Sequence, residues 1–198
     1  MAEAVIRTLC YLPLLLALLA FPSAVFAHRD DQYLQATLVA IEPSGVRLQI
    51  NLTPGVAVAE QVLAQIDRDR DGAISKNEAA AYAKLLKRDL TLRIDGRKLE
   101  LKLTASEFVS PEELRAGAGV IQMEFSAVVG SLAAGPHRLT LENRHLTALS
   151  VYLINAAQPT FATVQITRQK RNENQSAGEI EFIFHPFRPK IAASGARP

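Results

Sequence analysis

Alternating hydrophobic and polar residues predict strands along most of the chain. Residues 33–41 and 46–52 alternate on either side of a turn cluster and predict a hairpin. Residues 90–94 also alternate and lead into Asp95-Gly96, a dipeptide typical of hairpin turns; we expect the partner strand to continue through Leu99, Leu101 and Leu103. Further strands are expected over residues 120–129, 138–141, 149–154, 164–167 and 179–184. Short strands separated by turn signals favour a β-sandwich.

A helical period interrupts this pattern in the first half of the chain. The apolar residues between Ala59 and Ile66 fall at helical spacing, and a second helical run extends from Lys76 to about Arg88. The predicted fold is therefore mainly β, sandwich-like, with an inserted helix-loop-helix, and α+β overall. We expect one domain over residues 28–185, with the helix-loop-helix at about 56–88, and a loosely ordered tail over 186–198.

The first 27 residues have the three parts of an export signal. A short polar stretch with one cation, Arg7, precedes a nearly wholly apolar run, and Val25-Phe26-Ala27 places small residues where signal peptidase cleaves. The apolar run is short for a membrane span, and Pro22 interrupts it. We expect cleavage after Ala27 and a mature protein that is periplasmic or secreted.

The composition and the missing motifs exclude several kinds of site and function. The only cysteine of the 198 residues, Cys10, lies in the expected signal, so the mature chain has no thiol for a disulfide or a cysteine-ligated metal. The formal net charge of +2 is too small and too dispersed to indicate nucleic acid. The sequence contains no GxSxG, GxGxxG or phosphate-loop signature, and we expect no enzymatic activity.

The segment between the two predicted helices has oxygen donors at the spacing that a calcium loop requires. Ca²⁺ takes about seven oxygens, and a 12-residue loop supplies them from positions 1, 3, 5, 7, 9 and 12. The six residues at these positions all offer oxygen: Asp67, Asp69, Asp71, Ala73 through its carbonyl, Ser75 and Glu78. Gly72, at position 6, permits the sharp turn that such a loop needs.

This loop resembles the EF-hand family position by position, and the predicted flanking helices match its helix-loop-helix context. The alternative is a polar connection whose aspartates cap backbone groups without metal. Three aspartates so close in sequence repel one another unless a cation neutralises them, and alternation turns Arg68 and Arg70 away. We therefore predict one Ca²⁺ site. Sensor EF-hands work in pairs, and the sequence contains one such loop, so we expect a structural ion.

The four histidines leave an alternative open. After cleavage His28 would be the N-terminal residue, and its α-amino group and ring could bind Ni²⁺ or Cu²⁺, with His137, His145 or His185 as a further ligand. This describes a periplasmic transition-metal (Ni/Co/Cu) accessory protein. A third interpretation is a hydrolase with a structural calcium ion, which needs a nucleophile and a base brought together in space.

The chain also resembles a known domain family through several looser features. These are the export signal ending at Ala27-His28, the hairpin with residues 46–52, the helix-loop-helix, the strand with Asp95-Gly96, and the runs NRHLTALSVYLINA at residues 143–156 and ITRQKR at residues 166–171. Together they are similar, over about residues 28–185, to the soluble periplasmic domain that precedes the membrane part of HupE/UreJ-like nickel or cobalt transport proteins. No membrane helices follow before Pro198. The resemblance therefore implies a binding or accessory module, with a membrane transporter or another envelope protein as partner.

Overall fold

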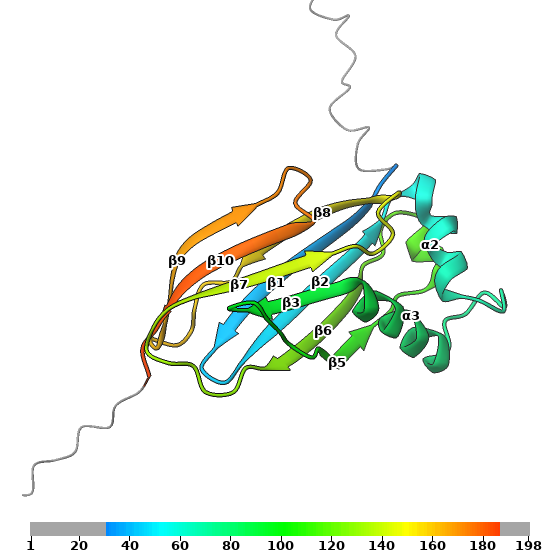
Figure 1. Ribbon diagram of the computed structural model, residues 1–198. Helices are drawn as coiled ribbons and strands as arrows, with labels where there is room; N and C mark the ends of the chain where they lie inside the picture. The colour runs from blue at the N-terminus through cyan, green and yellow to red at the C-terminus, as the bar shows by residue number, and fades with distance from the viewer. Residues whose placement is uncertain (1–30, 187–198) are drawn as a thin grey trace, which may run out of the picture.

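The computed structural model describes residues 31–186, which form a β-rich body with helices at one end (Figure 1). The predicted signal, His28 and nearly all of the predicted tail lie outside the described residues. Within those residues no helix is long and apolar enough to span a bilayer. In chain order the elements are β1 (Tyr33–Glu42), β2 (Gly45–Pro54), η1 (Val56–Val58), α2 (Ala59–Ile66), α3 (Lys76–Asp89), β3 (Leu90–Ile94), β4 (Arg97–Lys98), β5 (Lys102–Glu107), α4 (Pro111–Arg115), β6 (Ile121–Val128), β7 (Gly135–Asn143), β8 (Ser150–Ala156), β9 (Val164–Arg171) and β10 (Ala177–Phe184).

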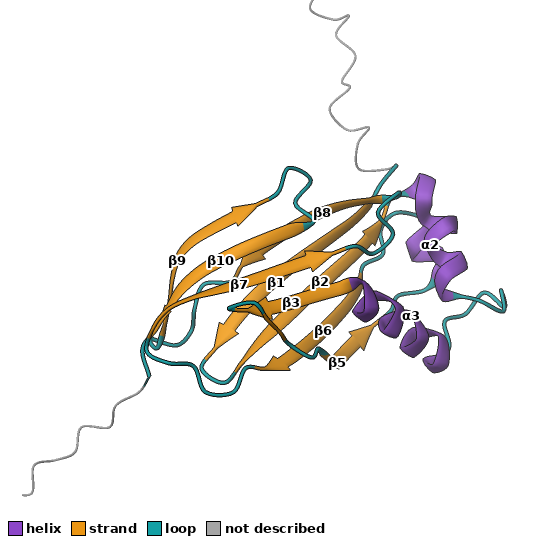
Figure 2. Ribbon diagram, viewed as in Figure 1, coloured by secondary structure: helices purple, strands orange, loops and turns teal. Residues whose placement is uncertain are grey.

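The strands form two five-stranded sheets (Figure 2). The order in the first sheet is β5-β6-β2-β1-β8, and the order in the second sheet is β4-β3-β7-β10-β9. Neighbouring strands are antiparallel, except that β8 runs parallel to β1. This arrangement confirms the predicted mainly β, α+β fold.

Alternation places the apolar side chains of both sheets in one core. Val39 on β1 lies opposite Leu48 on β2, and Leu92 on β3 lies opposite Leu141 on β7. All four side chains are buried and belong to the same hydrophobic cluster. Because successive residues of a strand point to opposite faces, a period of two buries one face of each sheet.

The helices α2 and α3 lie together at one end of the two sheets (Figure 2). Val62 and Ile66 on α2, and Tyr82 and Leu86 on α3, are each at most 1% exposed and join the same core. Residues four apart lie on one face of a helix, so each pair turns its helix toward the sheets. The loop that connects α2 to α3 is therefore attached at both ends to helices that pack in the core.

The Asp95-Gly96 hairpin forms, but its second strand, β4, contains only Arg97–Lys98. Leu99 and Leu101 then bury their side chains in the common core while the chain crosses to the first sheet, where β5 pairs with β6. The prediction that the same hairpin continues through Leu103 is wrong. Alternating leucines indicate burial at every second residue, and an extended segment between sheets meets that condition as well as a paired strand does.

A third helix, α4, was not expected from the sequence. Ser110 caps it in a reciprocal capping box with Glu113, and Leu114 is buried in the core. A helix of five residues is too short to show a helical period, so pattern analysis does not detect it.

Candidate metal centre

Backbone hydrogen bonds hold both ends of the loop between α2 and α3. At its start the Asp67 N–H donates to the Leu63 carbonyl at 2.8 Å and continues the last turn of α2. At its end the Ser75 hydroxyl accepts from the Glu78 N–H at 3.3 Å, and the Glu78 carboxylate accepts from the Ser75 N–H at 3.0 Å. This capping box determines where α3 begins.

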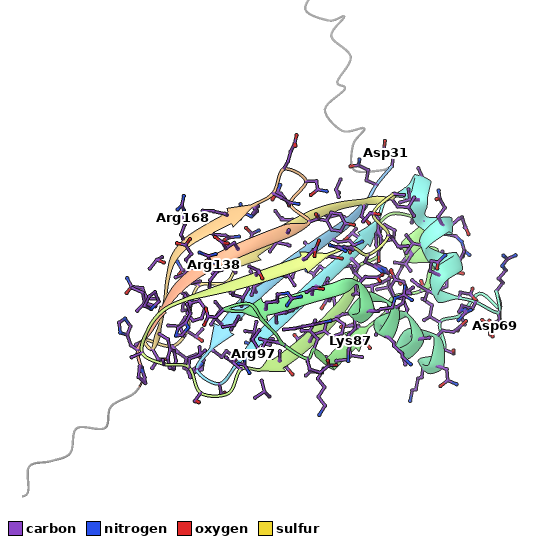
Figure 3. The ribbon with its side chains drawn as sticks, viewed as in Figure 1. Asp31, Asp69, Lys87, Arg97, Arg138 and Arg168 are labelled. Carbon is purple, nitrogen blue, oxygen red and sulfur yellow. The ribbon has the colours of Figure 1, made fainter. Side chains whose placement is uncertain are left out.

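Three carboxylates converge within the loop. Asp67, Asp69 and Asp71 each place a carboxylate oxygen within 4.8 Å of the other two. Asp67 is only 6% exposed, whereas Asp69 and Asp71 are exposed, and Figure 3 shows Asp69 at the end of the loop away from the sheets. Like charges at this separation repel each other unless a cation lies among them. The structure thus brings together the first three predicted ligands.

Backbone N–H groups of the loop orient these carboxylates. The Gly72 N–H donates to Asp67 Oδ2 at 3.1 Å, the Asp71 N–H to Asp69 Oδ1 at 3.2 Å, and the Ala73 N–H to Asp71 Oδ1 at 2.8 Å. Each of these bonds engages one oxygen of its carboxylate. The second oxygen of each carboxylate is then available to a ligand.

The second oxygen of Asp67, Oδ1, is buried without a hydrogen-bond partner. Leaving a buried acceptor unpaired costs roughly 1–3 kcal/mol, and more when the group is charged. A cation at this oxygen would offset that cost, and Asp69 and Asp71 offer further oxygens within 4.8 Å. A donor set of carboxylate oxygens suits hard divalent cations. The residues present therefore fit a bound divalent cation.

Glu78 is not part of this carboxylate cluster. Its Oε1 accepts from the Arg68 N–H at 2.7 Å, and its Oε2 accepts from the Ser75 N–H at 3.0 Å and from the Ser75 hydroxyl at 2.8 Å. The Ser75 hydroxyl, then the Ser75 and Arg68 N–H groups, hold the pKa of Glu78 below its ordinary value. The carboxylate thus bridges the start and the end of the loop, and ligation of an ion by Glu78 requires it to exchange some of these bonds.

The two remaining predicted ligands, Ala73 and Ser75, are exposed, and the Ser75 hydroxyl is engaged in capping α3. Ile74, between them, is half-buried and packs against the core. Three of the six predicted ligands therefore form a cluster. Participation of Ala73, Ser75 and Glu78 stays a prediction.

Two loop residues have a left-handed backbone. Gly72 has a φ of 83°, as its position in the loop predicts, and Arg70 has a φ of 61°. For a residue with a side chain this conformation costs roughly 1–2 kcal/mol. The sequence analysis missed Arg70, because nothing in that residue type signals a left-handed turn. The conformation follows from the tight curvature that brings the three aspartates together.

A second group of polar side chains lies toward the other end of α3. It consists of Tyr33, Tyr82, Asp89 and His145, and we call it the buried polar cluster. Asp89 Oδ2 is 2.8 Å from His145 Nδ1, and because a carboxylate only accepts, Nδ1 donates. In the neutral ring His145 Nε2 has a lone pair and accepts from the Tyr82 hydroxyl at 3.0 Å, and the Tyr82 oxygen then accepts from the Tyr33 hydroxyl at 2.7 Å. Burial lowers the pKa of His145, although Asp89 opposes this, and the lowered pKa favours the neutral ring.

Amide side chains complete the surroundings of this cluster. Gln35 donates to the His145 carbonyl at 2.9 Å, Asn143 donates to Gln35 at 2.9 Å, and the His145 N–H donates to Asn143 at 2.9 Å. Tyr33, Tyr82 and His145 are each at most 1% exposed. Because a substrate has no access to such groups, we interpret the buried polar cluster as structural. Its members come from positions far apart in the sequence, which explains why the sequence analysis did not find them.

The contacts of His137 and His145 favour neither the transition-metal alternative nor the hydrolase alternative. His145 lies in the buried polar cluster, whereas the ring of His137 contacts Asp95 and the Ala133 carbonyl. In the part of the chain that the structure describes, neither ring is hydrogen-bonded to a Ser or Thr hydroxyl. Among residues 31–186, the aspartate cluster of the loop is the only group of three or more His, Cys, Asp or Glu side chains close enough together to hold an ion.

Comparison of the chain with protein-family models, with curated proteins and with solved structures gives no match. Conclusions about function therefore depend on the loop itself.

Proposed function

We propose that the loop from Asp67 to Glu78 binds one Ca²⁺ ion. The observation that carries this proposal is the buried, unpartnered Oδ1 of Asp67, with carboxylate oxygens of Asp69 and Asp71 within 4.8 Å. The ion would neutralise the repulsion among three carboxylates and give the buried oxygen a partner.

The donor types support Ca²⁺ over other cations. The cluster contains carboxylate oxygens and no nitrogen or sulfur, which disfavours Ni²⁺ and Cu²⁺. The loop offers further oxygens at Ala73, Ser75 and Glu78, and Ca²⁺ takes six to eight oxygens in flexible geometry. Mg²⁺ requires a near-ideal octahedron and gives up its waters reluctantly, so we expect it to bind more weakly here.

The packing of the flanking helices supports a structural role for the ion. A sensor loop changes the angle between its two helices when calcium binds. Here Ile66 on α2 and Leu86 on α3 are fully buried in the core that both sheets share. Opening the helices would expose these side chains, at roughly 1.5–3 kcal/mol for each. The ion would instead hold the two helices in the arrangement described here.

The proposed biological setting is an exported binding or accessory module. Location in the periplasm or outside the cell rests on the sequence of residues 1–27 alone, and a membrane transporter or another envelope protein is the proposed partner.

Calorimetric titration of the purified protein with Ca²⁺ tests the site. We expect one ion per chain, and loss of at least tenfold in affinity in Asp67→Asn and in Glu78→Gln. Glu113→Gln is a matched control, because Glu113 makes the same capping box with Ser110 at α4 as Glu78 makes with Ser75 at α3. The Glu113 variant should bind Ca²⁺ within twofold of the original chain.

Three outcomes would contradict the proposal. Absence of binding up to roughly 10 mM Ca²⁺, about tenfold above the weakest affinity usual for extracellular calcium modules, would exclude a functional site. Unchanged affinity in Asp67→Asn would place the ion elsewhere. Equal effects of Glu78→Gln and Glu113→Gln would show that Glu78 only caps its helix.

A further inference from the structure

The connection between β6 and β7, residues 129–134, crosses from the first sheet to the second sheet at the end of the molecule away from the metal loop (Figure 1). Val129 at its start is 1% exposed, and Leu132 is half-buried and packs against the core. The connection therefore closes part of the core, and the contacts that hold it determine whether Leu132 stays covered.

His137, just after this connection, touches two groups that only accept hydrogen bonds. Its Nδ1 is 2.7 Å from Asp95 Oδ2 in the β3–β4 turn, and its Nε2 is 2.9 Å from the Ala133 carbonyl oxygen. A neutral imidazole has one N–H and one lone pair, so it satisfies one of these acceptors and opposes the other with its lone pair. Only the doubly protonated ring donates to both.

We infer that His137 is a proton-dependent latch: its imidazolium fastens the 129–134 connection to the β3–β4 turn, and loss of the proton releases the Ala133 contact. This device is independent of the metal loop, which lies at the other end of the molecule. The bond to Asp95 persists after deprotonation, because the carboxylate retains the one N–H that remains. The contact with Ala133 is therefore the one that opens.

The surroundings of the ring support a charged histidine. The side chain of His137 is 10% exposed and packs on Phe182, with ring centroids 5.5 Å apart. A surface hollow of about 500 Å³ beside it is lined by two carboxylates, Asp95 and Glu181, and by one cation, Arg138. Partial burial lowers the pKa of His137, but the hydrogen bond that the ring donates to the Ala133 carbonyl, together with the hydrogen bond to Asp95 and the charge of Asp95, outweighs this effect, so the pKa is raised.

A second anchor of the same connection does not depend on pH. The Arg97 guanidinium, on β4, donates to the Val129 carbonyl at the start of the connection (Figure 3 labels Arg97). Arginine stays charged throughout the range in which histidine titrates. When His137 loses its proton, the connection therefore loses its contact at Ala133, while Val129 at its start remains attached to Arg97.

Nuclear magnetic resonance on the purified protein tests the latch without any substitution. The His137 ring should titrate above its ordinary value of about 6.5. Backbone order parameters of residues 131–134 should fall from about 0.85 toward 0.6 or below as the pH rises through that titration. A ring that titrates at or below 6.5, or order parameters that are the same on both sides of the titration, would overturn the inference.

Two variants separate the latch from general effects of pH. In His137→Gln, residues 131–134 should show the mobile state at every pH, with no dependence on pH between about 5.5 and 8.5. His185→Gln is the control, because it removes an exposed histidine at the end of β10 and should leave the pH dependence of residues 131–134 unchanged. If the His137 variant keeps the pH dependence of the original chain, the inference is wrong.

Discussion

The two ends of α3 carry polar side chains that are stabilised in opposite ways. At its start, Asp67, Asp69 and Asp71 lie close together in sequence and in space, and the buried Oδ1 of Asp67 has no hydrogen-bond partner. At its end, the buried polar cluster is drawn from residues between 33 and 145, and each of its ring and hydroxyl groups has a partner. The first group needs a ligand to be satisfied, whereas the fold itself satisfies the second.

The largest effect is expected from breaking the buried polar cluster. Asp89→Ala removes the acceptor for His145 Nδ1 and should lower the free energy of unfolding by about 3 kcal/mol, measured by urea denaturation. Calcium affinity should change less than twofold, because the loop keeps all of its donors. The control is Arg88→Ala, which removes the exposed partner of the same carboxylate: the Arg88 side chain is 72% exposed and its Nε donates to Asp89 Oδ1 at 3.2 Å, so the variant should lose less than about 0.5 kcal/mol. Equal losses in both variants would contradict a structural role for the cluster.

Removal of calcium should have a slightly smaller effect. Chelation, starting from Ca²⁺ at about a hundred times its dissociation constant, should lower the free energy of unfolding by about 2.7 kcal/mol. Asp67→Asn should reduce this difference to about 1.4 kcal/mol or less, because binding that is at least tenfold weaker leaves Ca²⁺ at no more than about ten times its dissociation constant. Without calcium that variant should be at least as stable as the original chain, because it removes one of three mutually repelling charges. Thermal denaturation with and without chelator measures the chelator effect and the stability of the calcium-free variant, and a chelator effect as large in Asp67→Asn as in the original chain would refute the assignment.

A smaller gain is expected from relieving the left-handed backbone at Arg70. Arg70→Gly should raise the stability of the calcium-free protein by up to about 1 kcal/mol, because glycine adopts this φ without steric cost. Arg68→Gly removes the same charge from a residue that is not left-handed, and should lower stability through chain entropy. Chemical denaturation compares the two, and changes of the same sign would show that charge, rather than backbone conformation, decides the result.

The smallest net effect is expected from pH near neutrality, because the two histidines act in opposite directions. The pKa of His145 is lowered by burial, so its contribution to stability is present above about 6.5 and is lost as the pH falls. The pKa of His137 is raised, so its contribution is present below about 6.5 and is lost as the pH rises. In His137→Gln the free energy of unfolding should therefore increase with pH across this range. Denaturation at pH 5.5 to 8 measures the slope, and a falling slope in that variant would refute the assignment.

The elements that periodicity predicts correctly are those whose burial pattern is regular over many residues. The alternation at Val46, Leu48 and Ile50 identifies β2, and the spacing of Val62 and Ile66 identifies α2, because one buried face imposes its period on the sequence. Leu99 to Leu103 shows the limit of this inference. The same alternation occurs there in a segment that leaves one sheet for the other.

The candidate metal site likewise has one part that the sequence predicts and one part that it does not. The spacing of Asp67, Asp69 and Asp71 brings their carboxylates close together, since the five residues that span them curve through the left-handed Arg70 and lead into the left-handed Gly72. The ion and the capping box with Ser75 compete for the Glu78 carboxylate, and residue spacing does not predict which of them wins. A glutamate at the third position of a helix serves both purposes.

The sequence alone determined the secondary structure of the regular segments, the mainly β fold class and the composition of the acidic loop, because each depends on residues that are neighbours along the chain. Tertiary structure alone decided which sheet each strand joins, that Asp67 Oδ1 is buried, and how the two central histidines are held. His137 meets two acceptors and His145 meets an acceptor and a donor. The partners of the two rings lie between 4 and 63 positions away in the sequence, and the fold places them beside the rings. Two identical side chains thereby have pKa values that are shifted in opposite directions.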